Sequence, residues 1–157
     1  MSRPVARCAV LVVLVACGGA AAPAPDIDHS LVDTGQVCLS ASVDPGAAGA
    51  GTFAEDAPVY VSFDAIGVCL SSSCTRDPLA TCEVTRVGDG IAVTSLASWT
   101  DTSPSAEACT ADCGLLRASC QLGALPAGSY TVRYDGQELT LMVPSQLAAA
   151  PCLTAAD

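Results

Sequence analysis

Hydrophobic and polar residues alternate with a period of two in several stretches of the chain. Residues 37–43 read Val-Cys-Leu-Ser-Ala-Ser-Val, and residues 59–65 repeat the pattern with Val59, Val61 and Phe63 as apolar positions. A period of two places every second side chain on the same face of a strand. We therefore predict a half-buried strand in each of these stretches.

The middle of the chain predicts two further strands. Residues 79–87 form a third strand, residues 88–90 (Gly-Asp-Gly) form a tight turn, and residues 91–99 form the return strand. Residues 115–122 fit a strand or a short helix equally well, because their apolar spacing does not separate the two periods.

A β-hairpin is predicted between residues 130 and 141. Asp135-Gly136 separates two alternating stretches, and Asp-Gly favours the type I′ turn of a two-residue hairpin loop. Such a loop fixes the register, which pairs Tyr134 with Gln137, Arg133 with Glu138, Val132 with Leu139, and Tyr130 with Leu141. One face is then apolar and the other pairs Arg133 with Glu138, so the register is chemically consistent on both faces.

A family resemblance begins just before this hairpin. Residues 125–132 (Leu-Pro-Ala-Gly-Ser-Tyr-Thr-Val) resemble the L-x-x-G-x-Y-x-V segment of bacterial β-sandwiches, which include carboxypeptidase regulatory-like and Ig-like domains. The resemblance implies that residues 36–157 form an all-β, disulfide-stabilised antiparallel β-sandwich of about seven strands. It also makes Tyr130 a candidate tyrosine corner, whose hydroxyl bonds to the backbone upstream.

The first residues have the features of an export signal. Arg3 and Arg7 provide a positive start, and residues 9–16 are continuously apolar. This apolar run is much shorter than the roughly 20 residues that a membrane-spanning helix needs. Its length and its flanks are those of a signal peptide.

Residues 14–17 (Leu-Val-Ala-Cys) resemble a bacterial lipobox. The resemblance implies that residues 1–16 are a lipoprotein signal peptide and that Cys17 carries acyl chains. It places the protein in the cell envelope, anchored to a membrane. Gly18, which follows the cysteine in place of an Asp, favours the outer membrane, on its periplasmic or surface face, over the inner membrane. A secretory signal cut after Ala22 or Ala24 is the alternative and would give a secreted protein. The chain as a whole resembles Cys-rich lipoproteins of myxobacteria.

Residues 17–35 are expected to form a lipidated flexible tether. The segment is rich in Ala, Pro and Gly, then acidic, and it has no apolar period. His29, the only histidine of the chain, is expected to be a solvated linker residue.

The charge of the chain excludes one class of partner. The net charge is −10, with 16 acidic residues and six basic ones, all of them arginine. Binding to nucleic acid depends on clustered Lys and Arg, so no nucleic-acid partner is expected. The expected partners are the membrane, through the lipid anchor, and a protein that the sequence does not identify.

The folded region contains an even number of cysteines: Cys38, Cys69, Cys74, Cys82, Cys109, Cys113, Cys120 and Cys152. An exported protein keeps such cysteines as disulfides. No Cys-x2-Cys pair is present and His29 lies in the tether, so neither a metal site nor a redox dithiol is expected.

Eight cysteines allow 105 pairings. Hairpins centred near residues 75–76 and 113–114 would bring the outer cysteines of each group together, and a clasp would join the two ends of the domain. We therefore expect these four disulfides: Cys69–Cys82, Cys109–Cys120, Cys74–Cys113 and Cys38–Cys152.

No catalytic residue, and no cofactor, is predicted. The hydroxyls of residues 71–73 (Ser-Ser-Ser) have no Lys or domain His to activate them. Asp89, Asp101 and Asp112 are candidates for a calcium site, but they do not match the EF-hand pattern. The expected function is a non-enzymatic structural or interaction role in the cell envelope. The alternative is a small-ligand or protease-inhibitor-type binding module in the periplasm or on the cell surface.

Overall fold

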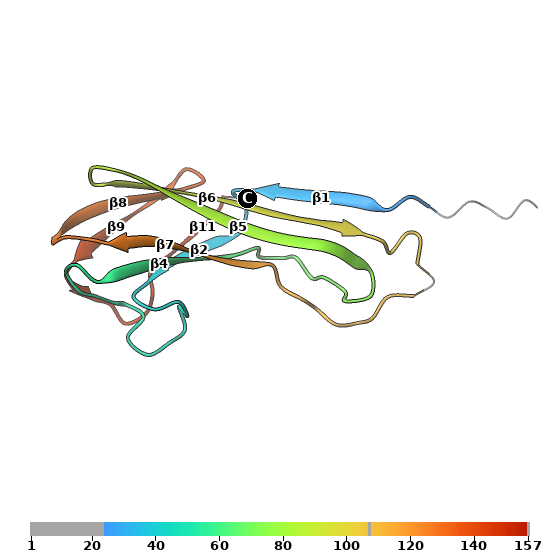
Figure 1. Cartoon of the computed structure of the whole chain (residues 1–157), viewed down its shortest axis with the longest axis horizontal. Helices are drawn as coiled ribbons and strands as arrows, with labels where there is room; N and C mark the ends of the chain where they lie inside the picture. Colours follow the sequence, from blue (N-terminus) through green and yellow to red (C-terminus); the bar gives the residue numbers. More distant parts are fainter. Residues whose placement is uncertain (1–23, 107, 157) are drawn as a thin grey trace, which may run out of the picture.

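The computed structural model describes residues 24–106 and 108–156, and this part of the chain is built from strands and loops (Figure 1). The strands are β1 (Ile27–Val32), β2 (Gln36–Ser40), β3 (Thr52–Phe53), β4 (Pro58–Asp64), β5 (Thr75–Val87), β6 (Gly90–Asp101), β7 (Arg117–Ala124), β8 (Gly128–Tyr134), β9 (Gln137–Val143), β10 (Ser145–Gln146) and β11 (Cys152–Thr154). None of these residues belongs to a helix long and apolar enough to cross a membrane. The predicted all-β class is confirmed.

Two main sheets make up the fold. In the first sheet, β6 pairs with β5 along one side. The other side of β6 pairs antiparallel with β1 and parallel with β8. β8 in turn pairs with β9. The second sheet has the strand order β11-β2-β4-β7 and is antiparallel throughout. A short pair, β3 with β10, lies apart from both sheets.

The core consists of apolar side chains from both sheets, which gives the fold a sandwich-like character. The second sheet contributes Val37, Leu39, Val59, Val61 and Phe63, and the first contributes Ile91, Val93, Ala97, Tyr130, Val132, Tyr134, Leu141 and Val143. Along β4 the buried positions alternate with half-buried ones, as a period of two requires. The core is mostly aliphatic, with only four aromatic rings that are fully buried: Phe53, Phe63, Tyr130 and Tyr134.

The C-terminal hairpin has the predicted register. Tyr134 pairs with Gln137 and each of the other expected pairs is present between β8 and β9. The turn residues Asp135 and Gly136 have φ values of 43° and 72°, which is the type I′ geometry. Tyr130 donates a hydrogen bond from its hydroxyl to the carbonyl of Pro126 at 2.8 Å, so the tyrosine corner is present.

The six strands predicted without ambiguity, the two of the hairpin among them, are all found, and the described residues form eleven strands instead of about seven. The ambiguous segment 115–122 is a strand, β7, because its backbone pairs with β4 along seven residues. The first predicted strand is shorter than expected: β2 ends at Ser40, whose hydroxyl bonds to the carbonyl of Ser42, and the next residue donates its N–H to the carbonyl of Ala50. Three short strands, β3, β10 and β11, had no sequence signal.

One expectation about the tether is wrong. Residues 27–32, placed by the sequence in a flexible tether that ends at residue 35, form β1 and pair with β6 along their whole length. Leu31 packs against the core and His29 stacks on Trp99, with ring centroids 4.7 Å apart. The prediction missed this strand because most of its side chains are exposed, so no apolar period marks it.

Candidate interaction site: two disulfide-braced loops

All eight cysteines of the folded region are paired. Cys38 and Cys152 form the predicted clasp, as register partners in β2 and β11 with Cα atoms 4.0 Å apart. The other three disulfides differ from the expected set; they are Cys69–Cys113, Cys74–Cys109 and Cys82–Cys120. The expected pairs Cys69–Cys82, Cys109–Cys120 and Cys74–Cys113 are therefore wrong.

The predicted hairpin around residues 75–76 is the source of the error. Thr75 begins β5, which continues for 13 residues and carries Cys82 away from Cys69. Cys82 is half-buried against the core and joins Cys120 of β7, which belongs to the other sheet. This disulfide thus connects the two sheets.

The remaining two disulfides hold two loops together at one end of the fold. The loop of residues 65–74 lies against residues 102–106 and 108–116, and we call these segments together the braced loops. Next to the Cys69–Cys113 disulfide, Leu70 and Gly114 exchange two backbone hydrogen bonds of 3.1 and 2.8 Å. The braced loops are therefore fixed by covalent and backbone contacts, although most of their side chains are exposed.

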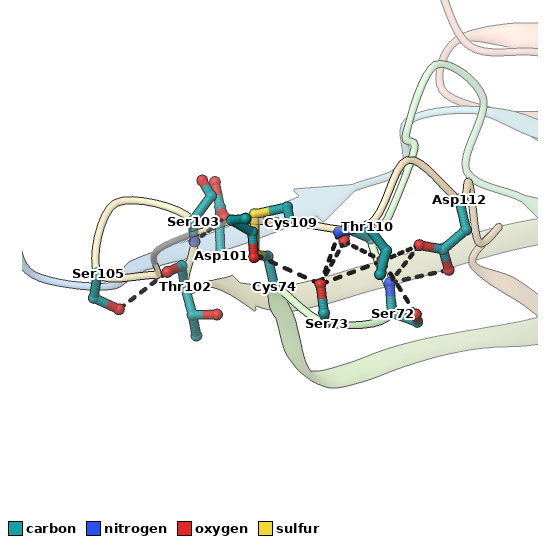
Figure 2. The surroundings of a disulfide bond; sticks show 12 residues. Ser72, Ser73, Cys74, Asp101, Thr102, Ser103, Ser105, Cys109, Thr110 and Asp112 are labelled. Carbon is teal, nitrogen blue, oxygen red and sulfur yellow. Dashed lines mark hydrogen bonds between the residues drawn. A yellow bond between two sulfur atoms is a disulfide. The ribbon is translucent and has the colours of Figure 1, made fainter.

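A group of hydroxyls surrounds one carboxylate on the braced loops (Figure 2). Asp112 accepts a hydrogen bond from the Thr110 hydroxyl and lies 3.2 Å from the backbone nitrogen of Ser72. The Thr110 hydroxyl is also 2.9 Å from that of Ser71, and the Thr110 N–H donates to the Ser73 hydroxyl at 2.8 Å. All of these donors come from the two loops themselves, so the group adds to the bracing.

These contacts weaken the basicity of the carboxylate. The hydrogen bond from Thr110, followed by that from Ser72, lowers the pKa of Asp112 below its usual value of 3.8. A carboxylate with a lowered pKa is a poorer general base. His29, the only histidine of the chain, is stacked on Trp99 of the paired strand β6. Within the described residues its imidazole makes no hydrogen bond to the hydroxyls of residues 71–73.

The three aspartates considered for calcium do not come together. Asp89 lies in the turn before β6 and Asp101 is the last residue of β6, so the length of this strand separates them. Asp101 accepts a 2.8 Å hydrogen bond from the backbone N–H of Ser103, which lowers its pKa. Within residues 24–106 and 108–156, no group of three or more His, Cys, Asp or Glu side chains has metal-binding geometry.

A separate open cleft of about 540 Å³ lies on the outer face of the second sheet. The loop of residues 43–46 forms one wall, and β4 and β7 form the floor. Arg117 and Asp64 form an ion pair of 2.5 Å at its edge. The hydroxyl of Ser62 is also in the lining and has no hydrogen-bond partner although its oxygen is buried. Sequence reasoning did not single out these residues, because the loop and the two strands meet only in three dimensions.

The predicted lipidation residue Cys17 and the predicted signal peptide of residues 1–16 lie outside the described residues. The disulfide ladder of the braced loops did leave a signal in the sequence: Cys69 and Cys74 are separated by nearly the same distance as Cys109 and Cys113. Two segments joined at both ends require such matched spacing. Comparison of the chain with protein-family models, with curated proteins and with solved structures gave no match.

Proposed function

We propose that this protein is a bacterial cell-envelope lipoprotein with a non-enzymatic structural or interaction role, attached to the membrane through acyl chains on Cys17. The observation that carries the proposal is the complete pairing of the eight cysteines in the folded region. Disulfides persist in the periplasm and at cell surfaces but are rare in a reducing cytoplasm. A chain with four of them needs export, and residues 1–17 provide a signal that ends in a lipidation motif.

The braced loops and the cysteine-linked sheets support an interaction role. Loops held rigidly on a sheet framework lose little conformational entropy on binding, so they are suited to present a recognition surface. The hydroxyls of the braced loops are engaged with one another and with Asp112, whose lowered pKa makes it a weak base. This chemistry favours binding over catalysis.

Processing at Cys17 tests the proposal directly. The full chain and its Cys17→Ala variant are expressed in a bacterium that processes lipoproteins, and membranes are separated from soluble fractions. We expect the wild type in the membrane fraction with an acylated Cys17 at its N-terminus by mass spectrometry, and the variant unprocessed or released. Cys8→Ala, within the signal, is the matched control and should be processed normally. A mature N-terminus after Ala22 or Ala24 would support the secreted alternative instead.

The cleft on the second sheet favours a second candidate function, a small-ligand binding module. Its lining combines an ion pair, a buried hydroxyl without a partner and apolar surface from Val43 and Pro45, which is the mixture found in ligand sites. A thermal-shift screen with small polar metabolites tests this function. A stabilising compound that loses its effect in Arg117→Ala, but keeps it in the exposed control Arg133→Ala, would support it.

A further inference from the structure

The cleft on the outer face of the second sheet is lined by three charged side chains. They are Asp64 at the end of β4, Arg117 at the start of β7, and Asp44 in the loop that forms the wall. Asp64 and Arg117 are register partners in neighbouring strands, which fixes their ion pair at the edge of the floor. Asp44 comes from a different segment, so the wall and the floor each contribute charge.

Arg117 keeps hydrogen-bonding capacity after this ion pair has formed. Its Nε lies 2.5 Å from Oδ1 of Asp64, whereas its two terminal nitrogens have no protein partner within residues 24–106 and 108–156. The side chain is 67% exposed, so an occupant of the cleft can reach these nitrogens. The end of a guanidinium presents paired N–H groups that match the two oxygens of a carboxylate.

Asp44 provides a negative charge on the wall. Its Oδ1 accepts a 2.9 Å hydrogen bond from the backbone N–H of Gly46, which holds the carboxylate on the loop. In the part of the chain that the structure describes, Asp44 has no ion-pair partner. Because Asp64 and Arg117 neutralise each other, the lining has a net charge of −1, carried by Asp44.

These charges discriminate between classes of small ligand. A simple anion would pair with Arg117 but would be repelled by Asp44 and by a chain of net charge −10. A simple cation would pair with Asp44 and leave the end of Arg117 unused. A zwitterion, with a carboxylate at one end and an ammonium group at the other, pairs with both side chains and adds no net charge.

The rest of the lining is suited to a small molecule. Oγ of Ser62 is buried in the floor and lacks a hydrogen-bond partner among the described residues, whereas most buried polar side-chain atoms bond to protein or ordered water. Val43, which is 65% exposed, and Pro45 offer apolar surface on the wall. The volume of about 540 Å³ falls within the range of ligand pockets, about 300–1,000 Å³.

We propose, resting on the second candidate function, that the cleft binds an amino acid or a short peptide with free termini. The carboxylate of the ligand pairs end-on with the terminal nitrogens of Arg117, and its ammonium group pairs with the carboxylate of Asp44. Small apolar side chains of the ligand lie against Val43 and Pro45.

A set of alanine peptides tests both charged contacts. The full chain is expressed in a bacterium, and its exported, disulfide-bonded product is isotopically labelled for NMR and titrated with alanine, dialanine and trialanine. We expect backbone amide signals of residues 43–46 and 117–119 to shift. Ordinary ligand efficiencies imply a Kd of a few millimolar or tighter for the zwitterion that fits best. Tightest binding of alanine identifies a free amino acid as the ligand, and tightest binding of a longer zwitterion identifies a peptide.

Modified ligands and two variants assign each end of the ligand to one side chain. N-acetyl-dialanine lacks the ammonium group and dialanine amide lacks the carboxylate, so each should bind the wild type about threefold more weakly than dialanine, as for the loss of an exposed ion pair. In Arg117→Gln, dialanine and its amide should bind equally, while acetylation still weakens binding. In Asp44→Asn, which keeps the Oδ1 acceptor for Gly46, acetylation should have no effect, while amidation still weakens binding.

Arg133→Gln is the matched control. Arg133 is also a strand residue of the described fold, paired through Nε with a carboxylate, that of Glu138, at 2.6 Å, but it lies outside the cleft. This variant should discriminate between the ligands as the wild type does.

Three results overturn the inference: no shift of the wall and floor signals with any of the three zwitterions, binding that is indifferent to the removal of either charged end, or variants that lose the opposite discrimination. The binding-module function is tested separately, because a stabilising compound of another class that depends on Arg117 would retain the cleft as a ligand site while this assignment fails. Acylation of Cys17 is measured independently of both.

Discussion

Loss of the Cys38–Cys152 disulfide should destabilise the domain more than loss of a disulfide between the braced loops. The two cysteines are 114 residues apart in the sequence. In the unfolded chain the other disulfides shorten the path between them, through Cys69–Cys113, to about 70 residues. The chain-entropy relation gives about 4.4 kcal/mol for closing a loop of about 70 residues.

The Cys74–Cys109 disulfide provides the matched comparison. Its cysteines are 35 residues apart, but with Cys69–Cys113 in place it closes a ring of only about ten residues. The same relation gives about 2.7 kcal/mol for a ring of about ten residues. The two deletions should therefore differ by about 1.7 kcal/mol, although each removes one disulfide and two sulfur atoms.

Urea unfolding of Cys38→Ala/Cys152→Ala and Cys74→Ala/Cys109→Ala measures this difference. The first variant should also have the larger m-value, because its unfolded state is more expanded and exposes more surface. Peptide mapping must show that the three other disulfides remain intact in each variant. The reasoning is refuted if the two variants lose the same free energy, or if the first loses less than about 1 kcal/mol, well below the chain-entropy value.

Three further outcomes are expected. Gly136→Val places a β-branched residue at φ 72° and should cost roughly 1–3 kcal/mol in chemical denaturation; an unchanged midpoint would contradict the type I′ turn. Tyr130→Phe removes the hydrogen bond to Pro126 and should cost about 1 kcal/mol, which thermal unfolding can detect. Burial raises the pKa of Tyr134 above 10.0, so the unfolded state loses this proton first. The raised pKa stabilises the folded state in full below pH 10, and this stabilisation is lost as the pH rises through the pKa of Tyr134 in the folded protein. A Tyr134→Phe variant should have a flatter stability curve in that range, and a curve as steep as that of the wild type would rule out this cause.

The parts of the fold that depend on neighbouring residues were predictable from the sequence. The hairpin of β8 and β9 follows from Asp135-Gly136 and the alternation on both sides of it, because a two-residue loop leaves one register. β2 and β4 follow in the same way from a period of two, and β5 and β6 from the Gly-Asp-Gly turn between them, whereas the apolar spacing in β7 left strand and helix open. The tyrosine corner also lies within a single short segment, since Tyr130 bonds to a carbonyl only four residues upstream.

The parts that depend on distant residues were not predictable. Three disulfide pairs were wrong because a local hairpin was assumed around residues 75–76, where a long strand begins instead. β1 was missed because its pairing with β6 is made by backbone groups, which leave no mark in the side-chain pattern. The cleft beside Arg117 is formed by segments far apart in the sequence, so the chain order gave no signal for it.

The position of β2 has a consequence for the order in which the chain folds. β2 lies between β4 and β11, and β11 is the last strand of the chain. During synthesis, or during transfer through a membrane, one edge of β2 stays without a neighbour until residues 152–154 have arrived. Contacts of such large sequence separation form slowly, and an open edge can pair with another chain. Self-association therefore competes with folding until the end of the chain is delivered, and a nascent chain that stops before Cys152 keeps this edge open for as long as it exists.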